Sequence, residues 1–294
     1  MSTAAGLREG PFGWLEWLLM AGTALMWGSS FLWIAKALES LEPASVTLIR
    51  LVLGALALGV TRRARSPVDR ADLGRIAVLG MVWMAVPLFL FPIAQQWVDS
   101  SIAGMVNGGT PIFAAAIAAI LLRRLPGRIQ SVGLALGFVG VVLVALPSVI
   151  EADGSPLGVG LVLIASFLYG LGLNLSIPLT QRYGVLPVLW RVQLTAVVAT
   201  APFGIFGLAD SSWAWSGAAA MLLLGVLSTG FAFVAMAELG KRVGSTRGSI
   251  GIYFIPVVAM GLGVVFRNET VAVLALAGTG FVILGAWLSS RRES

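Results

Sequence analysis

The stretch Gly22–Trp33, GTALMWGSSFLW, lies in the first long apolar run of the chain. A segment that only has to cross a membrane needs little more than about 20 apolar residues. This one places Gly28, Ser29 and Ser30 in its middle, directly after Trp27. Small residues let helices approach closely, and serine can form hydrogen bonds between helices. Two interpretations are therefore open: close helix packing, or the lining of a cavity for a small molecule.

The composition identifies the class of protein. Of the 294 residues, 58% are hydrophobic and 11% are charged, whereas an ordinary soluble domain has about 25% charged residues. This small number of charges cannot cover a surface that faces water. We therefore predict an all-α polytopic membrane protein. The chain has no cysteine and no histidine, which excludes disulfides, thiol chemistry and the commonest metal ligand. We expect no catalytic residue, no metal site and no cofactor.

Ten apolar runs are long enough to cross a bilayer, which takes about 20 residues of helix. The predicted transmembrane helices are 17–38, 44–61, 75–96, 101–122, 128–147, 157–180, 185–207, 217–238, 244–266 and 270–288. The connections are short, so no soluble domain is expected between them. Because the first run is long enough to span and more spans follow, we do not expect a cleavable signal at the N-terminus.

The basic residues predict the orientation, because Lys and Arg gather in cytoplasmic loops. They cluster in the loops 62–74, 123–128 and 239–247 and in the C-terminal tail. The opposite side receives only Lys36 and Arg267, so both termini are predicted to be cytoplasmic. The same placement in short loops argues against nucleic-acid binding, which the net charge of +6 would otherwise suit.

The chain repeats itself with an offset of 141–145 residues. Five pairs of positions correspond in order: Trp27-Gly28 with Tyr169-Gly170, Arg50 with Arg191, Leu79-Gly80 with Leu224-Gly225, Pro111 with Pro256, and Gly137-Phe138-Val139 with Gly280-Phe281-Val282. Each half holds five spans, an odd number, so the second half inserts upside down relative to the first. We predict two inverted five-helix repeats, residues 1–150 and 151–294. Transporters use this architecture to form a site between their halves.

Taken together, these features resemble the drug/metabolite transporter superfamily, EamA type. They are the five-plus-five spans, "LIR" early in the second span, a central proline in the fourth and ninth spans, and glycine-rich fifth and tenth spans. The Trp-rich first span and the overall length are most similar to the YddG-type aromatic amino-acid exporters. The resemblance implies an exporter in the bacterial inner membrane, with the fifth and tenth spans behind the cavity. In that family a Glu often follows the fourth and ninth spans; the second half has Glu269, but the first has Arg123-Arg124.

Aromatic and kinked positions at membrane depth suggest where a substrate binds. Trp27 lies about 15 Å into its span at 1.5 Å per residue, and its buried indole N–H needs a partner, which a polar cavity would supply. Tyr169, its repeat partner, raises the same question. Pro111 frees the carbonyl of Asn107, and Pro256 frees a carbonyl next to Tyr253. Backbone groups without helical partners are tolerated at membrane depth only inside protein or against water. The prolines are therefore either structural kinks or bends that direct polar groups at the substrate.

Arg50 and Arg191 lie inside predicted spans, where a charge is expensive and usually faces the interior of the bundle. Two interpretations stay open: the side chains snorkel or cap helix-end carbonyls, or one of them attracts a substrate carboxylate. The resemblance favours the structural interpretation, because an Arg at this position is usual in the family whatever the substrate.

The function expected from these features is export of amino acids, aromatic ones included, or similar small metabolites by alternating access. The predicted substrate-binding residues are Trp27, Ser30, Arg50, Gln95, Asn107, Tyr169, Asn174, Thr229 and Tyr253, with helix kinks at Pro111 and Pro256. No Asp or Glu lies at mid-span, so we expect facilitated transport without proton coupling. Export of other metabolites or drugs of the same superfamily is an alternative, and an intramembrane enzyme is a remote one. Membrane lipid is the other expected partner; the oligomeric state stays open, a monomer included.

Overall fold

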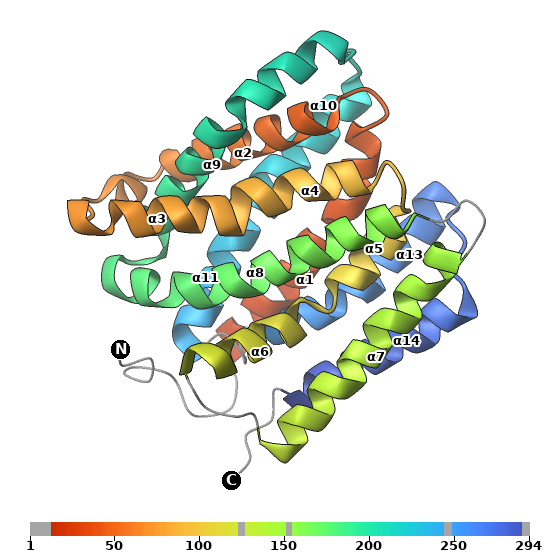
Figure 1. Cartoon of the computed structure of the whole chain (residues 1–294). Coiled ribbons are helices and arrows are strands. Elements are labelled where there is room, and N and C mark those ends of the chain that lie inside the picture. The colour runs from red at the N-terminus through yellow and green to blue at the C-terminus, as the bar shows by residue number, and fades with distance from the viewer. Residues whose placement is uncertain (1–12, 123–126, 151–154, 244–248, 290–294) are drawn as a thin grey trace.

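The computed structural model describes residues 13–122, 127–150, 155–243 and 249–289. Within these ranges the chain is helical and contains no strand, as the all-α prediction requires. The α-helices are α1 (Trp14–Ala37), α2 (Pro43–Gly59), α3 (Leu73–Gly80), α4 (Val86–Ala94), α5 (Ser100–Asn107), α6 (Thr110–Leu122), α7 (Arg128–Ile150), α8 (Pro156–Tyr183), α9 (Val185–Gly207), α10 (Trp215–Leu222), α11 (Ala232–Val243), α13 (Ile255–Arg267) and α14 (Val273–Ser289). They run side by side as one bundle (Figure 1).

Irregular backbone interrupts the helices in both halves. The π-helical segment Met81–Ala85 joins α3 to α4, and the π-helical segment Leu223–Phe231 joins α10 to α11. Gly108-Gly109 separates α5 from α6, and the 3-10 turn Ser249–Phe254 precedes α13. The span predicted at 244–266 is therefore a regular helix only from Ile255; residues 244–248 lie outside the described chain.

Six helices are long and apolar enough to cross a membrane by length and composition. They are Trp14–Ala37, Arg70–Ala94, Ser100–Leu121, Pro156–Tyr183, Val185–Asp210 and Trp215–Val243. Four shorter apolar helices, at 43–59, 131–144, 251–267 and 273–285, fall within the other predicted spans or at their edges. The total of ten crossings, and the side on which the termini lie, stay predictions.

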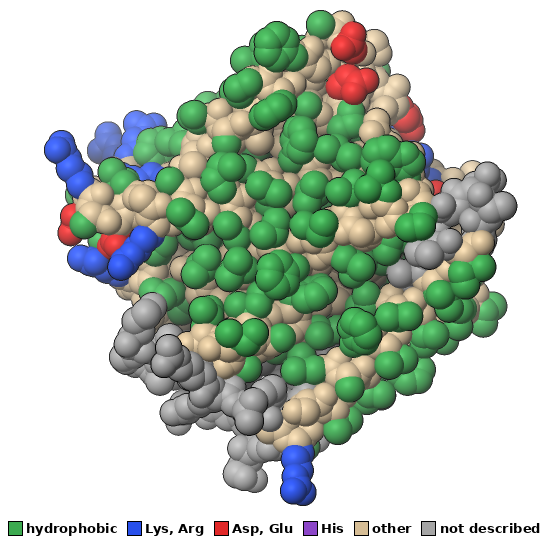
Figure 2. Space-filling view, viewed as in Figure 1, with side chains coloured by type: hydrophobic (Ala, Val, Ile, Leu, Met, Phe, Trp, Pro, Cys, Tyr) green, Lys and Arg blue, Asp and Glu red, His purple; other side chains and the backbone are tan. Residues whose placement is uncertain are grey.

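The surface agrees with a membrane environment. Hydrophobic side chains cover the face over α4 and α8, and Lys and Arg gather near the start of α3 (Figure 2). Large apolar side chains of α9 are likewise exposed rather than buried, with Phe206 at 79% and Val198 at 74%. In water such a surface would be an aggregation site, whereas in a bilayer it contacts lipid.

Glycines set the central packing. A Cβ added to Gly28 of α1 would overlap Val258 of α13, and one added to Gly170 of α8 would overlap the backbone of Phe113-Ala114 in α6. Because neither position has room for a side chain, α1 and α8 approach their neighbours closely. The packing interpretation of the GTALMWGSSFLW stretch therefore holds for Gly28.

Glu269 has a structural place in this bundle. Its carboxylate accepts hydrogen bonds from the backbone N–H of Ser100 at 3.2 Å and of Ser101 at 2.9 Å. It thereby caps the first turn of α5, where backbone donors have no partner inside the helix. Arg123-Arg124, at the corresponding place in the first half, lie outside the described residues.

Helices α7 and α14 form a pair held by glycine contacts at one side of the bundle (Figure 1). A Cβ on Gly285 would meet the backbone N of Gly137 and the backbone O of Gly133, so the two helices touch through their main chains. A Cβ added to Gly280, on the same helix as Gly285, would have no neighbouring atom within 4 Å.

We predict that Gly285→Ala lowers the free energy of unfolding by about 1–3 kcal/mol, because backbone cannot move aside for the added methyl group. Thermal unfolding in detergent, followed by loss of the monodisperse peak in size-exclusion chromatography, measures it. The matched control is Gly280→Ala, which should leave the midpoint unchanged or raise it. Equal midpoints for the two variants would contradict the α7–α14 contact.

Candidate binding site

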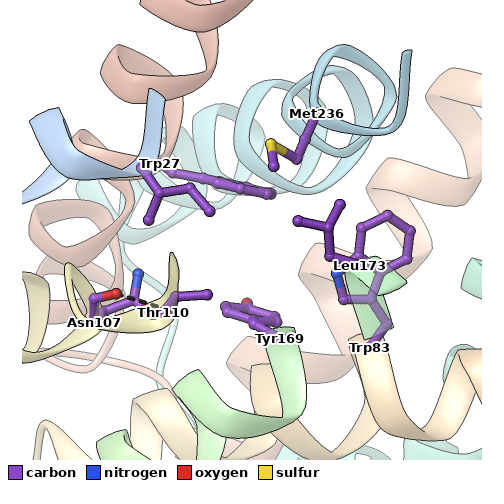
Figure 3. Close-up of a pocket in the computed structure, with 8 residues that line it drawn as sticks. Trp27, Trp83, Asn107, Thr110, Tyr169, Leu173 and Met236 are labelled. Carbon is purple, nitrogen blue, oxygen red and sulfur yellow. Dashed lines mark hydrogen bonds between the residues drawn. The ribbon is translucent and has the colours of Figure 1, made fainter. Parts of the chain in front are cut away.

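An aromatic cluster occupies the centre of the bundle, where α1, α8 and α11 meet. The rings of Trp27 and Tyr169 are parallel, with centroids 6.1 Å apart and planes 8° from one another. Phe233 sets its edge against both, with centroids 5.0 Å from Trp27 and 6.0 Å from Tyr169. The structure thus brings the two repeat-related aromatic residues into one site, and Figure 3 shows them on opposite sides of it.

The indole N–H of Trp27 finds its partner in irregular backbone rather than in a cavity. Nε1 donates to the carbonyl O of Ser228 at 2.9 Å. Ser228 lies in the π-helical segment, whose wider turns leave a carbonyl available for such a bond. In return the Ser228 hydroxyl donates to the carbonyl of Met26 at 2.6 Å. Two reciprocal bonds therefore tie α1 to the second half of the chain.

Two small spaces share Trp27, Asn107 and Tyr169 in their linings. The first, called here the apolar chamber, is lined by Trp27, Trp83, Asn107, Thr110, Tyr169, Leu173, Met236 and Ile252 (Figure 3). The second, called here the polar chamber, is lined by Trp27, Ser30, Phe31, Ile34, Arg50, Phe91, Asn107 and Tyr169. Each has room for roughly one water molecule. In this conformation neither space is large enough for an amino acid.

Arg50 brings a charge to the polar chamber. Its side chain is 2% exposed, and Nε donates to the Thr229 hydroxyl at 2.9 Å. Thr229 passes a hydrogen bond on to the carbonyl of Leu224 at 2.9 Å. Nη1 is buried and has no hydrogen-bond partner among the described residues. A buried donor without a partner is costly, so this nitrogen is a candidate contact for a bound acceptor.

Arg191, which the predicted repeat relates to Arg50, is bonded differently. Its Nη1 donates to the carbonyls of Pro187 at 3.0 Å and of Ala64 at 3.4 Å, and the guanidinium lies 5.7 Å from the centroid of the Trp190 ring. These partners match the structural interpretation, in which an arginine satisfies backbone carbonyls at a helix end. The two arginines that the repeat relates therefore have different surroundings.

Asn107 sits at the break between α5 and α6 and borders both chambers. Its carbonyl, which Pro111 frees, accepts a hydrogen bond from the Thr110 hydroxyl at 2.7 Å. Its Oδ1 accepts from the Ser166 hydroxyl at 3.2 Å. Pro111 is the second residue of α6, and Pro256 is likewise the second residue of α13. Both prolines therefore begin helices, where their missing N–H costs least.

Of the other predicted residues, Ser30 lines a chamber and Asn174 does not. Ser30 lines the polar chamber and donates to the carbonyl of Trp27 at 2.6 Å. Asn174 donates to the carbonyls of Ala114 at 3.0 Å and Gly170 at 2.9 Å, so it joins α8 to α6 and lines neither chamber.

Gln95 and Tyr253 also lie outside the two linings. Gln95, at the end of α4, has both amide atoms buried without a partner in the described chain. Tyr253 is 3% exposed and follows Ile252, which lines the apolar chamber. A substrate contact by either residue stays a prediction.

Several lining residues were not predicted from the sequence. Trp83, Leu173 and Met236 are apolar residues in apolar spans, so nothing in their type distinguishes them from core. Gln193 lines neither chamber, but it offered a signal, because an amide two residues after Arg191 is unusual in a span. It is fully buried, and its Nε2 donates to the carbonyl of Thr229 at 2.7 Å.

The carboxylates that form salt bridges lie near the ends of the bundle, away from the chambers. Glu16, near the start of α1, pairs with Arg242 at 3.4 Å. Asp72, before α3, accepts hydrogen bonds from Arg182 at 2.7 Å and from the Tyr183 hydroxyl at 2.6 Å. No Asp or Glu of the described chain lines either chamber.

Comparisons with known proteins agree with this architecture. A family model described as "EamA-like transporter family" matches residues 14–146 and 156–291. An "Uncharacterized transporter" of Archaeoglobus fulgidus is 23% identical over 95% of this chain and 99% of its own. A "Probable terminal-alkyne amino-acid exporter" of Streptantibioticus cattleyicolor is 26% identical over 94% of this chain and 93% of its own. A solved structure titled "Crystal structure of protein" shares the fold, with a TM-score of 0.66, 18% identity, and coverage of 92% of this chain and 96% of that one.

We predict that Trp27→Phe lowers the free energy of unfolding by about 1–3 kcal/mol, because it leaves the buried carbonyl of Ser228 without a donor. The midpoint of thermal unfolding in detergent is the measurement. Trp14→Phe, at a position 77% exposed, is the matched control and should unfold with the native midpoint. A Trp27→Phe protein as stable as the control would mean that the hydrogen bond from Trp27 to Ser228 contributes nothing to the free energy of unfolding.

Proposed function

Because the chain belongs to the EamA-like transporter family, we propose that it exports amino acids or similar small metabolites across the membrane. The observation that carries the proposal is the pair of chambers at the centre of the bundle, where the unpartnered Nη1 of Arg50 lies beside the Trp27–Tyr169 pair. A substrate carboxylate fits the guanidinium, and an apolar side chain fits the aromatic rings. The relative named as a probable amino-acid exporter supports this choice of substrate.

Alternating access is the proposed mechanism, through two inverted repeats at 1–150 and 151–294. Three correspondences support the repeat: π-helical segments in the third helix of each half, breaks before Pro111 and Pro256, and tight packing at Gly28 and Gly170. The closed chambers support the mechanism, because a substrate reaches them only if helices move. Exchange of conformations between related halves opens such a site to one side at a time.

Facilitated transport, without proton coupling, completes the proposal. Proton-driven carriers usually place a carboxylate or histidine in the membrane interior. Both chambers are lined without Asp or Glu, and the described carboxylates that form ion pairs do so near helix ends. The substrate's own gradient then drives export. We propose the bacterial inner membrane as the location, in line with the "Uncharacterized inner membrane transporter YedA" of Escherichia coli, which is 26% identical over 90% of this chain.

Aromatic amino acids are proposed to be among the substrates, as in the YddG-type exporters. Trp27 and Tyr169 already present parallel ring faces, with centroids 6.1 Å apart. Aromatic rings stack at centroid separations of about 4.5–7 Å, so a modest outward movement of one ring would let a substrate ring lie against both. Other metabolites or drugs of the superfamily remain the alternative substrates.

We predict that proteoliposomes loaded with unlabelled tryptophan or phenylalanine accumulate the labelled amino acid in counterflow at equal pH on both sides. The reason is that the proposed carrier needs only substrate to change conformation. Uptake that starts only when a pH gradient is imposed would overturn the facilitative mechanism. No uptake of any amino acid would overturn the proposed substrate.

We also predict that Arg50→Gln lowers this counterflow by about tenfold or more, because it removes the charged donor for the carboxylate. The matched control is Arg191→Gln, whose arginine bonds backbone carbonyls outside the chambers. Size-exclusion profiles show whether both variants fold. Normal transport by folded Arg50→Gln protein would contradict the role of Arg50.

A further inference from the structure

The chambers present hydrogen-bond donors. Nη1 of Arg50 is buried without a partner in the described chain. Asn107 also brings its Nδ2 donor to the polar chamber, and Tyr169 brings a hydroxyl that can donate or accept. All three side chains line the polar chamber, and Arg50 is 2% exposed. Donors held without partners in a low-dielectric interior favour a ligand rich in acceptors.

Four backbone or amide oxygens beside the chambers already accept a hydrogen bond from a side chain. The carbonyl of Asn107 accepts from Thr110 at 2.7 Å, and its Oδ1 accepts from Ser166 at 3.2 Å. The carbonyl of Trp27 accepts from Ser30 at 2.6 Å, and that of Ser228 accepts from the Trp27 indole at 2.9 Å. A ligand that brings only donors, such as an ammonium group, could add a second hydrogen bond to these oxygens but meets no carboxylate among the residues that line the chambers.

The charge of the lining points the same way. Arg50 is the one ionised side chain among the residues that line the two chambers, so the described site carries a charge of +1. A carboxylate neutralises it. A zwitterionic amino acid adds an ammonium close to the guanidinium, and like charges placed together in an interface cost several kcal/mol.

The apolar chamber suits the body of such a ligand. Its lining includes Trp83, Leu173, Met236 and Ile252, and it shares Trp27, Asn107 and Tyr169 with the polar chamber, where Arg50 lies. A molecule that spans the two chambers would place one end on the guanidinium and the other among these apolar side chains. Met236 has a flexible thioether side chain, which can adapt to apolar groups of different shape.

We propose that this site selects apolar monocarboxylates without a free ammonium group, such as deaminated or N-acylated counterparts of apolar amino acids, over the zwitterionic amino acids themselves. The carboxylate binds Arg50 and Asn107, and the apolar body passes the Trp27–Tyr169 pair into the apolar chamber. This inference rests on the proposed function and narrows its substrate class.

Three probes with one phenylethyl skeleton test it: 3-phenylpropionate, phenylalanine and phenethylamine. Equilibrium binding to the full chain in lipid nanodiscs measures each, so leakage through a bilayer plays no part. 3-Phenylpropionate should bind best, phenylalanine about tenfold more weakly and phenethylamine weakest. Phenylalanine binding as tightly as 3-phenylpropionate would overturn the inference and leave the amino-acid exporter standing. Binding of none of the three would overturn both.

A charge substitution gives the second test. Asn107→Asp keeps the acceptors that Thr110 and Ser166 use and adds a carboxylate beside Arg50. It should reverse the order, so that phenylalanine binds more tightly than 3-phenylpropionate. Gln96→Glu, at an exposed position, adds the same charge away from the chambers and should keep the native order. An unchanged order in folded Asn107→Asp protein would overturn the inference; if that variant does not fold, the three probes on the native chain decide it.

Discussion

Backbone polar groups at membrane depth have to be satisfied inside the protein, and this constraint shapes the centre of the molecule. The chain leaves the regular helix at Met81–Ala85, at Leu223–Phe231 and at Gly108-Gly109. Two carbonyls near these breaks accept hydrogen bonds from side chains. The carbonyl of Ser228 receives the Trp27 indole, and the carbonyl freed by Pro111 receives a threonine hydroxyl. The irregular segments are thus stabilised by the same side chains that line the chambers.

The buried guanidinium of Arg50 follows from this arrangement. A charge in the interior is tolerated when part of it is hydrogen-bonded and the rest can meet a ligand or water. Thr229, in the π-helical segment, supplies the first condition, and the polar chamber supplies the second. Arg191 in the other half is satisfied by backbone carbonyls. Of the two arginines that the proposed repeat relates, only Arg50 therefore keeps a buried guanidinium nitrogen without a partner in the described chain.

Much of the fold could be predicted from the sequence, because runs of about 20 apolar residues between charged loops leave few alternatives. Trp27, Ser30, Arg50, Asn107 and Tyr169 were found because polar or aromatic residues stand out at mid-span. Trp83, Leu173 and Met236 could not be found, since an apolar residue in an apolar span carries no sign of the space it faces. The different partners of Arg50 and Arg191 depend on contacts between distant helices, which a single sequence does not show.

The central claim is that a closed central site opens to one side of the membrane at a time. The chain has no cysteine, so Ser30→Cys, in the lining of the polar chamber, can be labelled without background. Membrane-impermeant thiol reagents added to one face or the other then measure its accessibility, with and without substrate. We expect slow labelling at rest. Adding substrate should change the face of the membrane from which the cysteine is labelled. Fast labelling from both faces at once would contradict this claim, because the pathway would then be a channel.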